Sequence, residues 1–420
     1  MNPALPASRG ARPVIAYLFT TFPKATETFL QREVSALLAD GYDLRLYSIW
    51  GGGGRYEGHA IHSFPWWRRL SLAWWLPWYA LRRPGAILAL ARAGLRRPRS
   101  WLNLGENLIS VAFALVHARH FGSLQPAHVH AVWAGGPAAA AWVLWRLDGH
   151  PFSAAGHAYD LYQDGGDGWL RGKLAPARFV RTSTEMGGAT LRAKGVPPEK
   201  VHVIRRGLMT LPPLKPLRAG RGRLRLLCVA RLVPKKGFDH QLAIYAALRE
   251  AGVDFEARIA GDGPLRRELE NDVARLGLGG RVSFLGHRPQ SEISELRAWA
   301  DVLLHTGVVA RDGDRDGLPN VIPEAMAAGV LVVTSPAAAT TEAITDGVSG
   351  RVAEPADAAP WVKILGELAA DDGLCNRLRA GARYWVEDEF DARRNAARLA
   401  ELFHAAIRAR EDRPPNGRIH

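Results

Sequence analysis

Residues 224–260 read LRLLCVARLVPKKGFDHQLAIYAALREAGVDFEARIA, and this stretch decides the fold class. Runs 224–230 and 255–260 are short and rich in apolar residues, as buried strands are, and residues 237–251 between them are predicted to form a helix. A helix that joins two such strands is typical of a parallel sheet with helices on its faces. The sequence therefore predicts an α/β fold.

The same alternation continues on both sides of this stretch. Towards the C-terminus the predicted elements are helices 263–276, 291–298 and 323–328 and strands 282–285, 302–305 and 331–334. Towards the N-terminus they are strands 14–19, 44–49, 127–133, 179–182 and 201–204, with a helix at 27–39. Residues 211–223 contain three prolines and no acidic residue, which predicts a linker. Two successive doubly wound units place a ligand crevice at the carboxyl ends of the strands and between the domains.

The composition of the 420 residues is that of a globular protein, with 47% hydrophobic and 23% charged residues. The formal net charge of +14 predicts a surface that attracts polyanions. Cys228 and Cys375 are far apart in sequence and have no metal-ligand spacing, which argues against a disulfide scaffold or zinc site and suits a reducing compartment. The N-terminus lacks the layout of a signal peptide, and no apolar run reaches the ~18 residues that span a bilayer.

Arginine and tryptophan concentrate in one segment of the N-terminal unit. No acidic residue occurs between Glu57 and Glu106, whereas eight arginines and six of the fourteen tryptophans fall there. The arginines are Arg68, Arg69, Arg82, Arg83, Arg92, Arg96, Arg97 and Arg99, and the tryptophans are Trp66, Trp67, Trp74, Trp75, Trp78 and Trp101. We interpret segment 65–101 as an interfacial segment that binds an anionic membrane surface. The alternative is that the tryptophans pack into the core and the arginines are solvated; nucleic acid is disfavoured because no recognition motif accompanies the basic run.

Two groups of residues at predicted strand ends suit a phosphorylated, polyhydroxylated ligand. Arg231 follows the strand 224–230, and Lys236 stands at the start of the next helix, where free amides and the helix dipole favour an anion. Residues 312–324 read DGDRDGLPNVIPE, in which Asp316 and Glu324 are suited to accept hydroxyl hydrogen bonds. Gly317 allows a close backbone approach, and Asn320 adds an amide. The alternative for Glu324 is an acid favoured by the helix dipole, and for Asp312 and Asp314 a solvated turn; we predict no magnesium site there.

One histidine of the N-terminal unit is a further candidate. His157 lies in SAAGHAYD, and Asp160 is close enough in sequence to orient it. A lone histidine is more often a structural residue than a functional one.

Several segments together resemble the family 4 retaining glycosyltransferases, which have the GT-B fold. They are FPKATETFLQREVSAL, GHAYD, VARLVPKKGF, IAGDGPLRREL, VSFLGH and DGLPNVIPEAMAAG, in the family's order over roughly residues 14–405. The sequence DGDRDGLP resembles an exopolysaccharide and colanic-acid-type subgroup. The resemblance implies two facing Rossmann-like domains with the cleft between them. Residues 1–212 would be the acceptor-binding domain and 213–385 the nucleotide-sugar-binding domain, with a C-terminal helix at about 386–412 that packs back on the first.

The resemblance also implies roles for individual residues. Arg231 and Lys236 would bind the donor diphosphate, Asp316 and His157 the donor sugar, and Glu324 the ribose hydroxyls. The catalytic residues would thus be His157, Arg231, Lys236 and Asp316, and the donor-binding residues Gly207, Gly317, Leu318, Asn320, Val321 and Glu324. The family transfers sugar with retention of configuration, with no metal ion and no cofactor.

The sequence departs from the family pattern at four places. Asp316 replaces the more common glutamate, and Arg205-Arg206-Gly207 replaces Pro-Asn-Gly. Residues 338–341 replace the usual Gly-Ile-Pro before Glu342, and the turn 20–26 lacks a glycine pair. These departures leave the identities of donor and acceptor open.

We expect a cytoplasmic, peripheral membrane enzyme that moves a sugar from a nucleotide-sugar to a lipid or lipid-linked acceptor in exopolysaccharide synthesis. UDP is the first choice of carrier because it is the commonest. The alternatives are a catalytically silent sugar-nucleotide-binding or scaffolding subunit and a soluble transferase for a small metabolite. A nicotinamide dehydrogenase is disfavoured, since no G-x-G-x-x-G follows the first strand.

Overall fold

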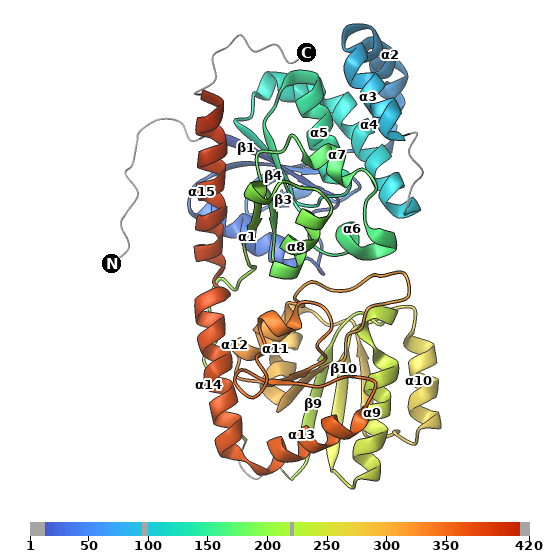
Figure 1. The fold of residues 1–420 in the computed structure, drawn as a ribbon, viewed down its shortest axis with the longest axis vertical. Coiled ribbons are helices and arrows are strands. Elements are labelled where there is room, and N and C mark those ends of the chain that lie inside the picture. Colours follow the sequence, from blue (N-terminus) through green and yellow to red (C-terminus); the bar gives the residue numbers. More distant parts are fainter. Residues whose placement is uncertain (1–12, 95–99, 219–221, 412–420) are drawn as a thin grey trace, which may run out of the picture.

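The computed structural model describes residues 13–94, 100–218 and 222–411 and contains two domains, each built on its own sheet (Figure 1). The N-terminal sheet has eight strands in the order β3-β4-β2-β1-β5-β6-β7-β8, all parallel except the β3–β4 pair. Its strands are β1 (Val14–Phe19), β2 (Asp43–Ser48), β3 (Gly54–Tyr56), β4 (His59–Ser63), β5 (His128–Ala131), β6 (Phe152–Ala155), β7 (Val180–Thr182) and β8 (Val201–Val203).

The C-terminal sheet has six parallel strands in the order β11-β10-β9-β12-β13-β14. They are β9 (Leu224–Val229), β10 (Phe255–Ala260), β11 (Val282–Gly286), β12 (Val302–His305), β13 (Leu331–Thr334) and β14 (Arg351–Val352). The predicted α/β fold with two Rossmann-like domains is therefore confirmed.

Helices cover both faces of each sheet, which is why strands such as β1, β5 and β12 are almost wholly buried. In the N-terminal domain they are α1 (Thr28–Ala39), α2 (Leu72–Arg82), α3 (Pro84–Gly94), α4 (Trp101–Leu124), α5 (Gly136–Asp148), α6 (Tyr159–Tyr162), α7 (Leu170–Leu174) and α8 (Glu185–Ala193). In the C-terminal half they are α9 (Phe238–Glu250), α10 (Arg266–Arg275), α11 (Gln290–Trp299), α12 (Val321–Ala327), α13 (Ala358–Ala370), α14 (Asp372–Glu389) and α15 (Ala392–Glu411). Each sheet thus separates two hydrophobic clusters.

The end of the chain differs from the single helix predicted at about 386–412. Helix α14 ends at Glu389, and α15 starts at Ala392. Asp391 separates them, because its carboxylate accepts the backbone N–H groups of Arg393 and Arg394 at 2.8 and 3.0 Å and so caps a new helix. Figure 1 shows α14 beside the C-terminal sheet and α15 beside α1 of the N-terminal domain. Residue 412 lies outside the described residues.

The arginine and tryptophan segment forms a helical layer on the outside of α4. The 3-10 helix Trp66–Ser71 leads into α2 and α3, and Tyr79 is buried against the core. Trp75 and Trp78 pack partly against this core, whereas Trp66, Trp74 and Trp101 are 71%, 71% and 80% exposed. Trp75 and Trp78 thus pack as the core alternative predicts, whereas Trp66, Trp74 and Trp101 do not, and membrane binding by the segment stays a prediction. Arg96, Arg97 and Arg99 lie outside the described residues. Nowhere in the described ranges does a helix have the length and apolarity that crossing a membrane requires.

Candidate functional site

The cleft between the domains brings together residues that follow strand ends of both sheets. Arg32, on the helix after β1, places Nη2 2.8 Å from Oε1 of Glu324, on the helix between β12 and β13. The backbone N–H of Met186, in α8, donates to Oε1 of Glu342 at 2.9 Å. The cleft is therefore lined by both halves of the chain.

A cluster of charges stands at the carboxyl end of β12. Nζ of Lys236 donates a hydrogen bond to Oδ2 of Asp316, and Nζ of Lys235 lies 3.0 Å from Oδ2 of Asp314 and 3.4 Å from Oδ1 of Asp316. Burial would raise the pKa of Asp316, but Lys236, His305 and Lys235 together hold this pKa well below its usual range. Asp316 is thus a carboxylate, and Lys236 carries the charge that an anion would need.

The loop after β9 carries both predicted diphosphate-binding residues. Arg231 is exposed, and Lys236 is half-buried at the end of the turn Pro234–Lys236. Gly237 follows with φ of +62°, and a Cβ atom there would lie 2.1 Å from the carbonyl oxygen of Thr306. Only glycine allows this approach, which brings Lys236 close to the loop that holds Asp316.

Glu324 is enclosed by two arginines that the sequence did not single out. Glu324 is only 6% exposed, and its Oε2 lies 2.8 Å from Nη1 of Arg297. Its Oε1 forms the ion pair with Arg32. Burial lowers the pKa of Arg297, and Glu324 opposes that shift. Glu324 lies in the first turn of α12, as predicted. A preference for the helix dipole would explain an acidic residue there, but it would not require two arginines around the carboxylate.

Two residues between Asp316 and Glu324, Gly317 and Asn320, lie against the N-terminal domain. A Cβ atom at Gly317 would lie 3.5 Å from the carbonyl oxygen of His157. Leu318 is buried, Val321 begins α12, and Oδ1 of Asn320 accepts a hydrogen bond from Nη1 of Arg206 at 3.4 Å. These contacts bring the predicted donor-binding loop against the predicted His157 loop.

His157 is buried between aromatic rings at the edge of this cleft. Its ring centroid lies 5.1 Å from Trp133 and 5.7 Å from Phe29, and its ring nitrogens make no hydrogen bond within the described residues. Burial, followed by the charge of Arg206, lowers the pKa of His157 well below its usual value, so the imidazole is neutral. A neutral ring with free polar atoms is suited to bind a hydroxyl group.

Asp160 positions the backbone at His157 rather than its ring. Its Oδ1 accepts the N–H groups of His157 and Ala158 at 3.1 and 3.0 Å, and its Oδ2 accepts that of Ala134 at 3.0 Å. One buried carboxylate therefore fixes the loops that follow β5 and β6.

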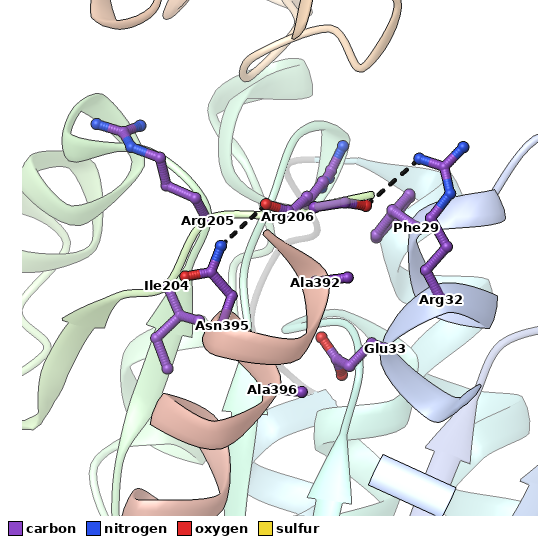
Figure 2. A pocket seen from close by; sticks show the side chains of 10 residues that line it. Phe29, Arg32, Glu33, Ile204, Arg205, Arg206, Ala392, Asn395 and Ala396 are labelled. Carbon is purple, nitrogen blue, oxygen red and sulfur yellow. Dashed lines mark hydrogen bonds between the residues drawn. The ribbon is translucent and has the colours of Figure 1, made fainter. Parts of the chain in front are cut away.

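A pocket lies where α1, the segment after β8 and the start of α15 meet (Figure 2). The buried guanidinium of Arg206 lies 3.6 Å from the ring centroid of Phe29, and burial lowers its pKa to about 10. Gly207 has a packing role here, because a Cβ atom would lie 2.2 Å from the backbone nitrogen of Ala392. Arg206 was identified from the sequence only as a departure from the family pattern, and neither Arg32 nor Arg297 was predicted to have a role.

The structure thus brings most of the predicted site residues to one cleft. Lys236 contacts Asp316, and His157 lies against Gly317, while Arg231 is exposed on the neighbouring loop. Within the described residues there is no group of three or more histidine, cysteine or acidic side chains that could hold a metal ion.

Comparison with known proteins agrees with this arrangement. Residues 215–385 match the family described as glycosyl transferases group 1. Over 420 residues the chain is 27% identical to the putative colanic acid biosynthesis glycosyltransferase WcaL of Salmonella typhimurium, covering 92% of this chain and 98% of WcaL. Over 213 residues it is 36% identical to the amylovoran biosynthesis glycosyltransferase AmsK of Erwinia amylovora, covering 50% of this chain and 52% of AmsK.

Solved structures share the fold over almost the whole chain. HepE of Anabaena, determined in complex with UDP and glucose, superposes with a TM-score of 0.69 at 17% identity, covering 94% of this chain and all of that one (100%). Sucrose-phosphate synthase of Thermosynechococcus elongatus superposes with a TM-score of 0.73 at 16% identity, covering 95% of this chain and 100% of that one. The predicted GT-B architecture is confirmed.

Proposed function

We propose that the protein transfers a sugar from a nucleotide-sugar to an acceptor, because residues 215–385 match the family described as glycosyl transferases group 1 and the chain has a GT-B fold. Residues 213–385 would hold the donor and residues 1–212 the acceptor. The observation that carries the proposal is the cleft itself, where the ion pair of Lys236 and Asp316, the buried carboxylate of Glu324 and the neutral ring of His157 converge.

Each part of a nucleotide-sugar has a matching group in the cleft. Lys236 and Arg231 would bind the diphosphate, since cations on a loop before a helix favour an anion. The carboxylate of Glu324 would accept hydrogen bonds from ribose hydroxyls, and Asp316 and His157 would bind the hydroxyls of the sugar. Gly207, Gly317, Leu318, Asn320 and Val321 would provide close backbone and amide contacts. HepE, which was solved with UDP and glucose, has the same fold, and UDP is therefore the first nucleotide to test.

The reaction would proceed with retention of configuration and without a metal ion or cofactor. As the bond between the sugar and the diphosphate breaks, negative charge grows on the leaving oxygen, and Lys236 and Arg231 would stabilise it. The leaving phosphate would take the proton of the acceptor hydroxyl, which attacks the same face of the sugar. No protein side chain then needs to act as nucleophile or base.

The exposed part of segment 65–101 suggests where the acceptor is found. Trp66, Trp74 and Trp101 are exposed, and Arg82, itself exposed, places its guanidinium 4.7 Å from the ring centroid of Trp78. Exposed indoles among arginines suit the headgroup region of an anionic membrane. We therefore propose that the protein is peripheral on the inner face of the cytoplasmic membrane. There it would extend a lipid or lipid-linked acceptor in exopolysaccharide synthesis. WcaL and AmsK are named as glycosyltransferases of colanic acid and amylovoran biosynthesis, which supports the last part of this proposal.

Membrane binding can be tested apart from catalysis. Replacing Arg82 and Arg83 by serine removes two charges, each worth about 1 kcal/mol near an anionic surface, and should weaken binding about 30-fold. Replacing Arg393 and Arg394 on α15 by serine removes the same charge elsewhere and serves as control. Co-sedimentation with phosphatidylglycerol vesicles measures both. Equal binding by wild type and the first variant would refute the membrane proposal.

Transfer is tested with radiolabelled nucleotide-sugars and a bacterial lipid extract. We expect label in the lipid phase with one donor, and none with the Glu324→Gln variant of equal thermal stability. Transfer without lipid to a small metabolite would favour the soluble-enzyme alternative. Donor binding with no transfer to any acceptor would favour the silent subunit.

A further inference from the structure

Arg32 contacts two predicted donor-binding residues, Glu324 in the other domain and Gly207 in its own half of the chain. Its Nη2 lies 2.8 Å from Oε1 of Glu324. Its Nη1 donates to the carbonyl oxygen of Gly207 at 3.5 Å (Figure 2). The side chains of Arg32 and Glu324 are 15% and 6% exposed. This ion pair joins the two domains and is largely shielded from water.

The proposed function assigns the carboxylate of Glu324 to the donor ribose, and both oxygens of this carboxylate already have a partner. Oε1 of Glu324 is taken by Arg32 and Oε2 by Arg297, each at 2.8 Å. With so little of Glu324 exposed, ribose hydroxyls can reach the carboxylate only if one guanidinium moves away.

The two arginines differ in how firmly they are held. Arg297 belongs to α11 of the same domain as Glu324, and its Nη2 also donates to Oγ of Ser294 at 3.1 Å. Arg32 belongs to α1 of the other domain, and its second contact is the long one to Gly207. A relative movement of the domains would therefore separate Arg32 from Glu324 and leave Arg297 in place.

We propose that Arg32 and the donor ribose hydroxyls compete for the carboxylate of Glu324, so that binding of the donor displaces Arg32. The inference rests on the proposed function. Arg32 is then a positioning residue that competes with the donor: its guanidinium pairs with a buried carboxylate, and binding of the nucleotide must break this ion pair. Removing a cation from the site of an anionic ligand usually weakens binding, whereas removal of Arg32 should strengthen it.

The competition predicts a gain of affinity when Arg32 is removed. The variant Arg32→Gln should bind the preferred nucleoside diphosphate about five- to tenfold more tightly, the size expected for one ion pair that no longer has to be broken. The 2′,3′-dideoxy form of the same nucleotide cannot donate ribose hydroxyls to Glu324. Its affinity should therefore be the same in the variant and in wild type.

Titration calorimetry of the full chain with both nucleotides tests these expectations. The control variant Arg45→Gln removes the same charge from an exposed ion pair with Asp43, 3.1 Å away on β2, and should bind both nucleotides as wild type does. Weaker binding of the diphosphate by Arg32→Gln would show that Arg32 contacts the donor directly and would overturn the inference. Unchanged affinity, or an equal gain for both nucleotides, would overturn it as well. A folded wild-type protein that binds no nucleoside diphosphate would instead refute the proposed donor site, and the inference with it.

Discussion

Replacing Lys236 by alanine should weaken binding of the donor diphosphate strongly. Lys236 is paired with Asp316, and Nζ of Lys235 lies 3.4 Å from Oδ1 of the same aspartate. The variant loses a charge-assisted contact to the diphosphate, which is worth about 1.5 to 3 kcal/mol. Asp316 would keep its negative charge because Lys235 remains beside it, and this carboxylate then repels the ligand.

The effect should therefore lie in the upper part of that range. A loss of about 2 to 3 kcal/mol corresponds to a roughly 30- to 150-fold increase in the Kd for the nucleoside diphosphate. Calorimetric titration at constant ionic strength measures it. The control is Lys200→Ala, because Nζ of Lys200 donates to the carbonyl oxygen of Ala175 at 2.6 Å, on the N-terminal side of β8 away from the cleft. A Kd for Lys236→Ala equal to that of wild type, in a folded protein, would refute the assignment of Lys236 to the diphosphate.

Two further predictions concern buried carboxyl groups of the N-terminal domain. Asp160→Asn should lower kcat at least tenfold and leave the Kd for the nucleoside diphosphate unchanged. The reason is that Asp160 fixes the loop of His157 and touches none of the proposed diphosphate ligands. An equal loss of kcat and of affinity for the nucleoside diphosphate would contradict this role. Burial raises the pKa of Glu106 from 4.5 to about 7, so the native protein holds this proton more tightly than the unfolded chain does. The free energy of unfolding should therefore fall as pH rises from 4.5 to about 7, by at most ~3 kcal/mol. Urea unfolding of Glu106→Gln should lack this part of the pH dependence, and identical profiles for variant and wild type would count against it.

Five of the six strands of the C-terminal sheet could be predicted to within one residue at either end, whereas β14 was not predicted. The bounds of β12 and β13 agree with runs 302–305 and 331–334, because both strands are short, buried and apolar except for their last residues, His305 and Thr334. Helix α4 was not predicted, although it has 24 residues. Its buried face includes Asn103, Glu106 and Ser110, and polar residues on that face conceal the helical period.

The site could be predicted only where its residues are close in sequence. Asp316 and Glu324 stand in one short segment, and Lys236 follows a strand end, so local reasoning found them. Arg32 contacts Glu324 across 292 positions, and no pattern near either residue indicates the contact. In the same way, the role of Asp160 depends on the turn after β5, which the order of residues in SAAGHAYD does not reveal.

The most direct test of the donor site is a thermal-shift measurement of wild type and Glu324→Gln with UDP, GDP and ADP. A ligand that binds only the folded state raises the apparent Tm, and at a given concentration the shift is larger for a tighter ligand. We predict that one nucleotide raises the Tm of wild type and that its effect is lost or much reduced in the variant. Equal shifts in both proteins, or no shift in folded wild type with any nucleotide, would contradict the claim that this cleft binds a nucleotide-sugar.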